Sequence, residues 1–405
     1  MTEEIQLTII GAGVIGCAVA AEISRKCSGE ILVIEKNSQI AGENQSSRNS
    51  GVIHAGIYYP RDFGPLKSYL CVKGNSMLYD FCEKHGVPCK KTGKLVLATN
   101  ALEEEYLEDV LRIAQENGVP GIKLVGGRQI KNIEPNVEAV AGLYVPTSGI
   151  IEPTLFVKKL YNIAEEQGVI FLTGNKLTEI KPGSDGGFLI RIKSRNSEEI
   201  FETRFLINCA GLFSDEIAKM IDPLSPYEID PVKGESAKFY CRKRENIIVK
   251  GANIYPVPFG YFSDGERANV HFKKFIELFR ESKVTKSVGV HLTPVFDLID
   301  GRYETGNTIT IGPAYSKPLN KDDYTTVRDS GYFYEMVKPF FPNIRIEDIT
   351  LHQAGIRAKL KGYYDFVIKR SSIYPDAINL IGIDSPGLTS SLAIAEYVRQ
   401  LLGDI

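Results

Sequence analysis

The clearest pattern of apolar and polar positions lies at the start of the chain. The apolar run Leu7–Ile10 predicts a buried strand, and the small apolar residues after the next glycines predict a closely packed helix. A second apolar run, Ile31–Ile34, predicts another buried strand. A strand, a glycine turn, a helix and a strand in this order are typical of a βαβ unit. The pattern therefore predicts an α/β fold with a parallel sheet.

The turn inside this unit carries glycine at the three positions of a G-x-G-x-x-G motif. Gly11 permits the tight turn, Gly13 lets the backbone approach a pyrophosphate, and Gly16 lets the helix pack closely on the strand. The helix N-terminus favours phosphate charge. Glu35 ends the second strand, about 20 residues past the last glycine, where a carboxylate can accept hydrogen bonds from ribose hydroxyls. The unit as a whole predicts a dinucleotide site.

Further along the chain the periodicity changes. Helical spacing gives way to alternation, and from residue 231 to about 296 alternation dominates, which predicts a β-rich segment. A charged insert, residues 260–286, interrupts it. The last residues predict a strand, a Pro-Gly loop and a helix opened by Thr389. The other predicted helices are 66–85, 102–117, 154–167 and 272–282, and the predicted strands include 94–99, 169–172, 176–181, 188–194, 199–204, 205–208 and 308–311.

Composition narrows the functional classes. With 405 residues the chain suits two or three domains, and its 43% hydrophobic and 24% charged residues are ordinary for a globular protein. A net charge of −2 without a basic run argues against nucleic acid as a partner. Seven cysteines include no C-x-x-C pair, so we expect reduced thiols and no metal site. We expect a cytoplasmic protein, with peripheral contact to the inner face of a membrane left open.

A polar loop follows the second strand and offers hydroxyl, amide and guanidinium donors in one run. A solvated turn would have the same composition, but the place of the run, one loop after the ribose-binding acid, favours contacts with a phosphate or flavin. The apolar strand 205–208 closes on Ala210 and Gly211, where the backbone would come close to a bound dinucleotide. The donors of the polar loop are Ser46, Ser47, Arg48, Asn49 and Ser50.

Longer segments carry a family resemblance. The glycine motif, the β-rich middle and the terminal strand, loop and helix together resemble the FAD-dependent D-amino-acid-oxidase-like oxidoreductases over essentially the whole chain. Within that superfamily the sequence is similar to the L-2-hydroxyglutarate dehydrogenase/oxidase group, from which the insert at 260–286 departs. The similar segments are SSRNSGVIHAGIYYP (46–60), LKSYLCVKG (66–74), NIYPVP (253–258), GVHLTP (289–294), IGPAY (311–315), AGIRA (354–358) and SPGLTSS (385–391).

The resemblance implies FAD as the cofactor and two domains. A discontinuous, Rossmann-like FAD-binding domain would comprise residues 1–85, 140–220 and 345–405, and a mainly antiparallel β-sheet domain for the substrate would comprise 86–139 and 221–344. The residues expected at the cofactor are Gly11, Gly13, Val14, Ile15, Gly16, Glu35, Lys36, Ser46, Ser47, Arg48, Asn49, Ser50, Val52, Leu177, Ala210, Gly211, Arg357, Pro386, Gly387, Leu388, Thr389 and Ser390.

Oxidation of a C–H bond next to a hydroxyl group needs a hydride acceptor, a base and a cation for an acidic substrate. His291 is expected as the base because its strand should face the flavin, with His54 as the alternative, which could contact the cofactor instead. Arg357 resembles the family's carboxylate-binding segment, where a guanidinium gives a bidentate match; its alternative is a surface ion pair. Tyr255 either donates its phenol to the substrate or fills the sheet.

These expectations define one leading function and its alternatives. The leading function is FAD-dependent oxidation of a small anionic 2-hydroxy acid, L-2-hydroxyglutarate to 2-oxoglutarate, by hydride transfer to flavin N5. A glycerol-3-phosphate dehydrogenase is the first alternative, because its flavin loop also resembles SSR followed by I-H-x-G. An amino-acid or amine oxidase of the same fold and a non-catalytic nucleotide-binding protein follow. The electron acceptor (a quinone, oxygen or a carrier protein) has no sequence signal.

Overall fold

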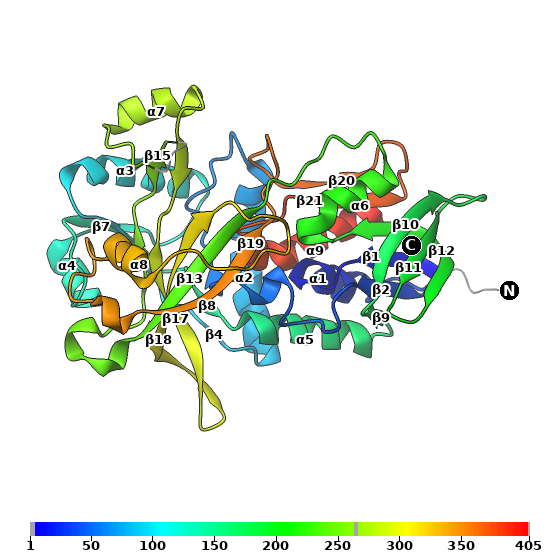
Figure 1. Ribbon diagram of the computed structural model, residues 1–405, viewed down its shortest axis with the longest axis horizontal. Coiled ribbons are helices and arrows are strands. Elements are labelled where there is room, and N and C mark those ends of the chain that lie inside the picture. Colours follow the sequence, from blue (N-terminus) through cyan, green and yellow to red (C-terminus); the bar gives the residue numbers. More distant parts are fainter. Residues whose placement is uncertain (1–4, 263–265, 404–405) are drawn as a thin grey trace.

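Two large β-sheets lie at the two ends of the elongated molecule (Figure 1). The computed structural model describes residues 5–262 and 266–403. Part of the predicted insert, residues 263–265, and the outermost residues of the predicted FAD-binding domain, 1–4 and 404–405, lie outside the described residues. Both the first strand and the last helix belong to the same end, whereas the middle of the chain forms the other. This mixed α/β architecture confirms the predicted fold class.

The first sheet has the parallel core that the βαβ pattern predicted. Its strands are β1 (Ile5–Ile10), β2 (Ile31–Glu35), β9 (Ile170–Thr173), β10 (Lys176–Pro182), β11 (Phe188–Lys193), β12 (Glu198–Asn208), β20 (Val367–Arg370) and β21 (Ala377–Ile381). The strands β21, β12, β1, β2 and β9 run parallel in that order. The remaining three pair antiparallel at the edges. The carboxyl ends of the central parallel strands therefore meet at one edge of the sheet.

One strand of this sheet differs from the prediction. The sequence analysis divided it into 199–204 and 205–208, whereas β12 is a single strand. Its first half pairs with β11 and its second half with β1. The half-exposed pattern therefore becomes a continuous buried run near Leu206 without any break in the backbone. A change of partner strand, and not a turn, causes the change of pattern.

Helices cover both faces of the first sheet. They are α1 (Val14–Ile23), α2 (Pro65–His85), α5 (Pro153–Glu166), α6 (Ser214–Ile221) and α9 (Gly387–Leu402). α1 packs against α5 and α9 on one face, α2 packs against α9, and α6 covers the other face. α9 begins two residues before Thr389, which corrects the prediction. Thr389 and the two serines after it are buried inside the first turns and do not cap the helix.

The second sheet is mainly antiparallel and faces the first. Its order is β19-β13-β18-β17-β14-β5-β7-β6, with β14 and β5 parallel. The strands are β5 (Lys94–Ala98), β6 (Lys123–Gly126), β7 (Ala141–Val145), β13 (Val232–Tyr240), β14 (Asn253–Pro256), β17 (His291–Ile299), β18 (Arg302–Ser316) and β19 (Thr350–Arg357). β7 and β19 lie in ranges that the sequence analysis gave to the FAD-binding domain, yet they pair in this sheet. The domain division itself stays a prediction.

The outer faces of the second sheet are covered by short helices and by the insert. The helices are α3 (Ala101–Glu116), α4 (Gly127–Ile133), α7 (Phe272–Arg280) and α8 (Ser330–Val337). The insert leaves and rejoins the fold through a small hairpin of β15 (Phe259–Tyr261) and β16 (Thr285–Ser287). Within it, α7 packs against α3, and the buried Phe275 ring lies 5.4 Å from the ring of Tyr106. The described part of the insert thus packs on the second sheet through α3.

Three further short strands and five single turns complete the part of the chain that the structure describes. β8 (Gly149–Ile151) pairs with β3 (Val52–Ile53) and β4 (Cys89–Lys90). The turns of 3-10 helix are Gln45–Ser47, Gly211–Phe213, Cys241–Lys243, Glu245–Ile247 and Ile346–Asp348. Within residues 5–262 and 266–403, every helix is too short or too polar to cross a membrane.

Candidate active site

A cavity of 1910 Å³ lies between the two sheets. Pockets for a single drug-sized ligand are about 300–1,000 Å³, so this cavity has room for a dinucleotide and a further small molecule. On one side it is bounded by residues that follow the carboxyl ends of β1, β2 and β12, which is where doubly wound sheets bind their ligands. On the other side it is bounded by β13, β14, β17, β18 and β19. Residues of the insert border it as well.

The glycine turn has the close contacts that a dinucleotide motif requires. Gly11 has a φ of +98°, and a Cβ there would lie 2.6 Å from the carbonyl oxygen of Cys209. A Cβ on Gly16 would lie 1.8 Å from the Gly11 carbonyl oxygen, so only glycine lets α1 pack this closely. Gly13 is the N-cap of α1, and the N–H of the next residue donates to the Oγ of Ser46 at 2.8 Å. The polar loop is therefore attached to the helix N-terminus.

Glu35 is held beside the same turn. One carboxylate oxygen accepts a hydrogen bond from the Ala12 N–H at 2.8 Å, and the other accepts one from the Asn37 N–H at 2.9 Å. Burial raises the pKa of Glu35, and these two backbone hydrogen bonds oppose that rise. Each oxygen keeps a lone pair for a further donor. Glu35 can therefore still accept hydrogen bonds from a ribose.

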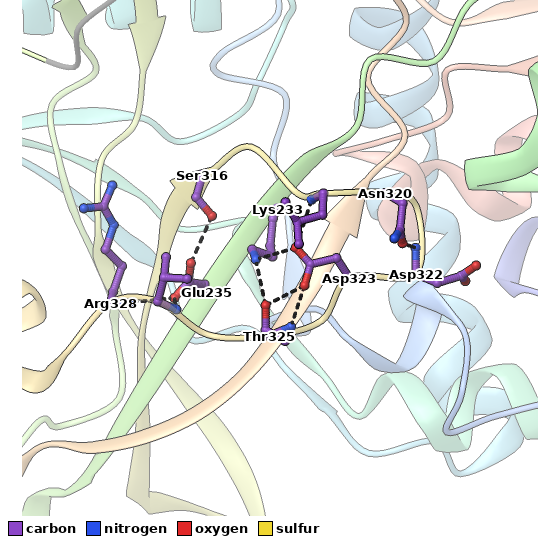
Figure 2. Close-up of polar contacts among 10 residues, drawn as sticks. Lys233, Glu235, Ser316, Asn320, Asp322, Asp323, Thr325 and Arg328 are labelled. Atoms are coloured by element: carbon purple, nitrogen blue, oxygen red, sulfur yellow. Dashed lines mark hydrogen bonds and ion pairs between the residues drawn. The ribbon is translucent and has the colours of Figure 1, made fainter.

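Residues 317–328 form a loop between β18 and α8 that borders the cavity, and we call this loop the strap. Lys233 on β13 is fully buried and donates to Asp323 of the strap at 3.0 Å (Figure 2). Two residues along β13, Glu235 accepts hydrogen bonds from the backbone N–H groups of Val327 and Arg328 at 2.7 and 2.9 Å. Two buried side chains of alternate positions on one strand thus fix both halves of the strap.

The strap touches two residues predicted to bind the cofactor, Lys36 and Arg48, and also Gln45. The amide of Gln45 donates to the Tyr324 hydroxyl at 2.6 Å, and the Arg48 guanidinium lies 4.3 Å from the centre of the same ring. Asp322 lies 3.6 Å from the Nζ of Lys36. Asp322 and Tyr324 both line the cavity. We infer that the strap helps to retain the dinucleotide.

Replacing Lys233 by methionine should therefore weaken FAD retention. The variant removes the cation that pairs with Asp323 and so loosens the attachment of the strap to β13. Loss of about 1.4 kcal/mol from this source would already weaken FAD binding tenfold. The measurement is the rate of FAD release on dilution, followed by flavin fluorescence. Lys317→Met is the matched control, because it removes an exposed strap pair with Asp230, and equal release rates in all three proteins would contradict the inference.

Most residues predicted at the cofactor line the cavity, and three do not. Gly16, Thr389 and Ser390 lie behind the lining. Thr389 accepts a hydrogen bond from the backbone N–H of His54 at 3.0 Å and so joins α9 to the loop after β3. The lining residues are Gly11, Gly13, Val14, Ile15, Glu35, Lys36, Ser46, Ser47, Arg48, Asn49, Ser50, Val52, Leu177, Ala210, Gly211, Arg357, Pro386, Gly387 and Leu388.

The second sheet brings His291 and Tyr255 together. They stand opposite each other on β17 and β14, as the pairing of Ile254 with Leu292 requires, and their rings stack at 3.7 Å with an angle of 10°. Both line the cavity. The Nδ1 of His291 lies 3.2 Å from the Thr293 hydroxyl. Burial lowers the pKa of His291 well below its usual value, so at neutral pH the imidazole is unprotonated and can accept a proton.

His54 approaches the cavity from the opposite side. Its Nε2 lies 3.3 Å from the hydroxyl of Ser385, which is 3.4 Å from the hydroxyl of Tyr59. Its carbonyl oxygen accepts a hydrogen bond from Asn75 at 2.9 Å. Burial is the main cause that lowers its pKa well below the usual value, with Arg357 contributing. Both candidate histidines can therefore act as bases, and their geometry leaves both assignments open.

Arg357, the last residue of β19, extends into the cavity beside an acidic partner. Its guanidinium donates to Asp384 at 2.6 Å and to the Tyr315 hydroxyl at 3.1 Å. The other oxygen of Asp384 accepts from Lys67 at 2.8 Å. Burial acts to lower the pKa of Arg357, but Tyr315 and Asp384 raise it above its usual value. A guanidinium has five N–H donors, and its Nε makes no hydrogen bond to the described residues, so donors remain for an anion.

Sequence reasoning missed several residues of this site. Ser385 opens the quoted SPGLTSS segment but was given no role, and Asp384 directly precedes that segment. A charged residue shortly after the end of β21 was a signal that could have found Asp384. Tyr59 lay inside a quoted segment without a role. Lys94 opens the apolar strand KLVLA, where one charged residue on a fully buried strand was the available signal.

A cavity that joins a dinucleotide turn to a sheet carrying an unprotonated histidine is what an oxidoreductase with a dinucleotide cofactor needs. The cofactor is FAD, because the chain belongs to the family described as FAD dependent oxidoreductase, whose family model matches residues 6–401. The residues present fit FAD: the glycine cradle, the open lone pairs of Glu35 and the cavity volume all suit a dinucleotide.

Three known proteins that resemble this chain carry different names. It is 32% identical to the mitochondrial L-2-hydroxyglutarate dehydrogenase of Caenorhabditis elegans, over 97% of this chain and 92% of that protein. It is 30% identical to the glycerol 3-phosphate dehydrogenase of Caloramator mitchellensis, over 98% of this chain and 74% of that protein. The FAD-bound L-alpha-glycerophosphate oxidase from Mycoplasma pneumoniae superposes with a TM-score of 0.80 and 25% identity, over 99% and 95% of the two chains.

Proposed function

We propose that the protein oxidises a small 2-hydroxy acid, with L-2-hydroxyglutarate as substrate and 2-oxoglutarate as product. The observation that carries the proposal is the placing of an arginine with spare donors and an unprotonated histidine on strands of the same sheet, both lining the cavity. The similarity to a named L-2-hydroxyglutarate dehydrogenase over 97% of the chain supports this acid among others.

The chemistry divides between the cofactor and the protein. FAD supplies the hydride acceptor. Arg357 binds the carboxylate next to the reacting carbon and so fixes the orientation of the substrate. His291 accepts the hydroxyl proton while the hydrogen on carbon 2 leaves as hydride, which balances the conversion to the 2-oxo acid. Tyr255 holds the imidazole of His291 in place by stacking against it.

Glycerol 3-phosphate is the second candidate substrate. The similarity to the Caloramator protein and to the Mycoplasma oxidase favours it, and a dianionic phosphate could use the donors of Arg48 and Arg357. The segments that carry Tyr255, His291 and Arg357 favour the hydroxy acid instead. The insert, which borders the cavity through Phe279, is proposed to shape the end that receives the distal anionic group.

Anaerobic mixing with candidate substrates separates the two proposals. We expect L-2-hydroxyglutarate to bleach the flavin absorbance fastest, because it presents a carboxylate beside the reacting carbon. Glycerol 3-phosphate, D-amino acids and sarcosine are the comparison compounds. Bleaching by glycerol 3-phosphate alone would replace the substrate and leave the family and cofactor unchanged. Flavin that no compound reduces would favour a non-catalytic role.

The location and the electron acceptor complete the proposal. The sequence-based expectation of a cytoplasmic enzyme is retained, although the name of the worm relative places that protein in mitochondria. Fractionation of source cells, with the antigen followed by blotting, tests the location. A quinone, oxygen or a carrier protein takes up the electrons of the reduced flavin.

A further inference from the structure

Lys94 is a buried cation that the proposed chemistry has not used. It opens β5, is only 1% exposed, and forms an ion pair with no carboxylate of the described residues. Its Nζ instead lies 3.8 Å from the centre of the Tyr255 ring and 5.2 Å from that of Tyr58. Lys233, also buried in the second sheet, has Asp323 as its partner at 3.0 Å. The charge of Lys94 is therefore stabilised by cation–π contacts with Tyr58 and Tyr255 and not by a carboxylate of the described residues.

The strand order connects Lys94 to the proposed base. β5, β14 and β17 are neighbours, with Lys94 paired to Asn253 and Ile254 paired to Leu292. Positions 94, 255 and 291 consequently project from the same face of the sheet, because side chains alternate along a strand. Tyr255 occupies the middle strand of the three and contacts both the ammonium of Lys94 and the imidazole of His291.

Burial of this charge is costly to the fold. An ammonium group taken out of water without a carboxylate loses its hydration, and cation–π contacts return only part of that free energy. An apolar side chain of the same size would fill the position at least as well. The arrangement thus adds positive charge beside the reacting region without contributing to the packing that a methionine could supply.

We propose that Lys94 is a positioning residue for the oxidation, whose ammonium, held on the Tyr255 ring, opposes protonation of His291 so that the imidazole enters the reaction as a base. This inference rests on the proposed function. It explains why a charged side chain occupies a position that an apolar side chain could fill. Lys94 acts through its neighbours, since it does not line the cavity.

The groups around the histidines agree with this role. His291 faces Lys94 from β5, Tyr255 from β14, Thr293 on its own strand and His54 from the loop after β3. Burial is the main cause that lowers the pKa of His291, and the charge of Lys94 is the next. His54 faces Lys94 as well, and also Arg357.

Lys94 itself titrates near neutrality. Burial lowers its pKa to about 7, with the Cys71 thiol opposing the shift. Below that pH Lys94 carries its charge, and protonation of the neighbouring imidazoles is then disfavoured. The lysine therefore extends the unprotonated state of the base toward acid pH.

The test compares wild-type holoenzyme with Lys94→Met in two measurements. The first is an NMR titration of the histidine Cε1–H signals without substrate, with the His291 signal assigned from a His291→Gln variant. The second is the pH dependence of anaerobic flavin reduction by L-2-hydroxyglutarate. Loss of a nearby like charge should raise the midpoint of His291 by about one pH unit. The acid limb of the reduction rate should move upward by the same amount.

Matched variants separate charge from packing. Lys94→Arg keeps the charge and should return the midpoint toward the wild-type value. Lys317→Met removes an exposed lysine that pairs with Asp230 and should not move the midpoint. Lys94→Gln serves as a second neutral variant if the methionine variant is not recovered.

Thermal unfolding adds a check on the burial of the charge. The folded pKa of about 7 lies below the unfolded value of 10.5, so the unfolded chain binds more protons between these values. The wild-type melting temperature should accordingly rise relative to that of Lys94→Met as the pH increases through this window.

Each outcome decides the proposal. An unchanged His291 midpoint in both neutral variants would overturn it, as would a shift of equal size in Lys317→Met. A wild-type enzyme that no 2-hydroxy acid reduces overturns the proposed function instead. In that case the NMR titration, which uses no substrate, still decides whether Lys94 keeps the histidine unprotonated.

Discussion

Replacing His291 by glutamine is expected to slow flavin reduction by L-2-hydroxyglutarate about 10²–10⁴-fold, the usual contribution of a general base. Glutamine is polar and of similar size, so the stacking position against Tyr255 stays filled. It cannot accept the hydroxyl proton in the transition state, whereas the substrate carboxylate still finds its arginine. Stopped-flow absorbance at several substrate concentrations should therefore show a fall in the limiting rate with little change in the apparent dissociation constant.

His54→Gln is the matched variant for this experiment. His54 is half-buried and also unprotonated, but its Nε2 lies 3.3 Å from the hydroxyl of Ser385. A small effect on reduction together with weaker FAD binding would assign it to the cofactor. If His54→Gln gives the larger loss of rate and His291→Gln the smaller, the two roles are exchanged.

The lowered pKa values of these histidines also fix the direction of acid sensitivity. The unfolded chain takes up protons near 6.5, whereas the folded His291 and His54 do not. The folded state consequently loses stability as the pH falls through about 6.5 and below, and it gains none from these groups at higher pH.

Local sequence was sufficient for the first βαβ unit of the fold. The strand, glycine turn, helix and acid of the first unit depend on contacts within 35 residues, and the steric limits at Gly11 and Gly16 are those the motif predicted. The long amphipathic helices were also predictable, because each buries one face in a single core. Errors came where the partner changes along an element, as in β12, or where buried hydroxyl residues resemble a cap, as at Thr389.

The substrate side depends on contacts that no local pattern contains. Arg357 and Asp384 meet through separate elements, and Lys67 joins them from α2. Strand β19 joins the second sheet through β13, which lies far earlier in the sequence, and β7 joins it through β5 and β6. The strap is fixed by two buried side chains of β13, those of Lys233 and Glu235. They lie about 90 residues before it in the chain, a separation that local periodicity does not cover. Tertiary pairing of charges decides these features.

Arg357→Lys is the second large expected effect. Lysine keeps one positive charge but offers no planar fork, so it cannot hold a carboxylate in two hydrogen bonds while pairing with Asp384. Losing a charge-assisted bidentate contact should cost about 2–4 kcal/mol, which is about 30- to 1,000-fold in kcat/KM. FAD content, measured from the flavin spectrum, should stay close to that of the wild type, because the glycine turn and Glu35 are unaffected.

A shortened substrate shows which carboxylate Arg357 binds. L-2-hydroxybutyrate lacks the distal carboxylate of L-2-hydroxyglutarate but keeps the one beside the reacting carbon. If Arg357 holds the latter, Arg357→Lys lowers kcat/KM by a similar factor for both acids. If it holds the distal group, the variant affects only the dicarboxylate. Asp384→Asn supplies the control for the ion pair: unchanged kcat/KM in Arg357→Lys, with equal losses of melting temperature in both variants, would show that Arg357 serves only to neutralise Asp384.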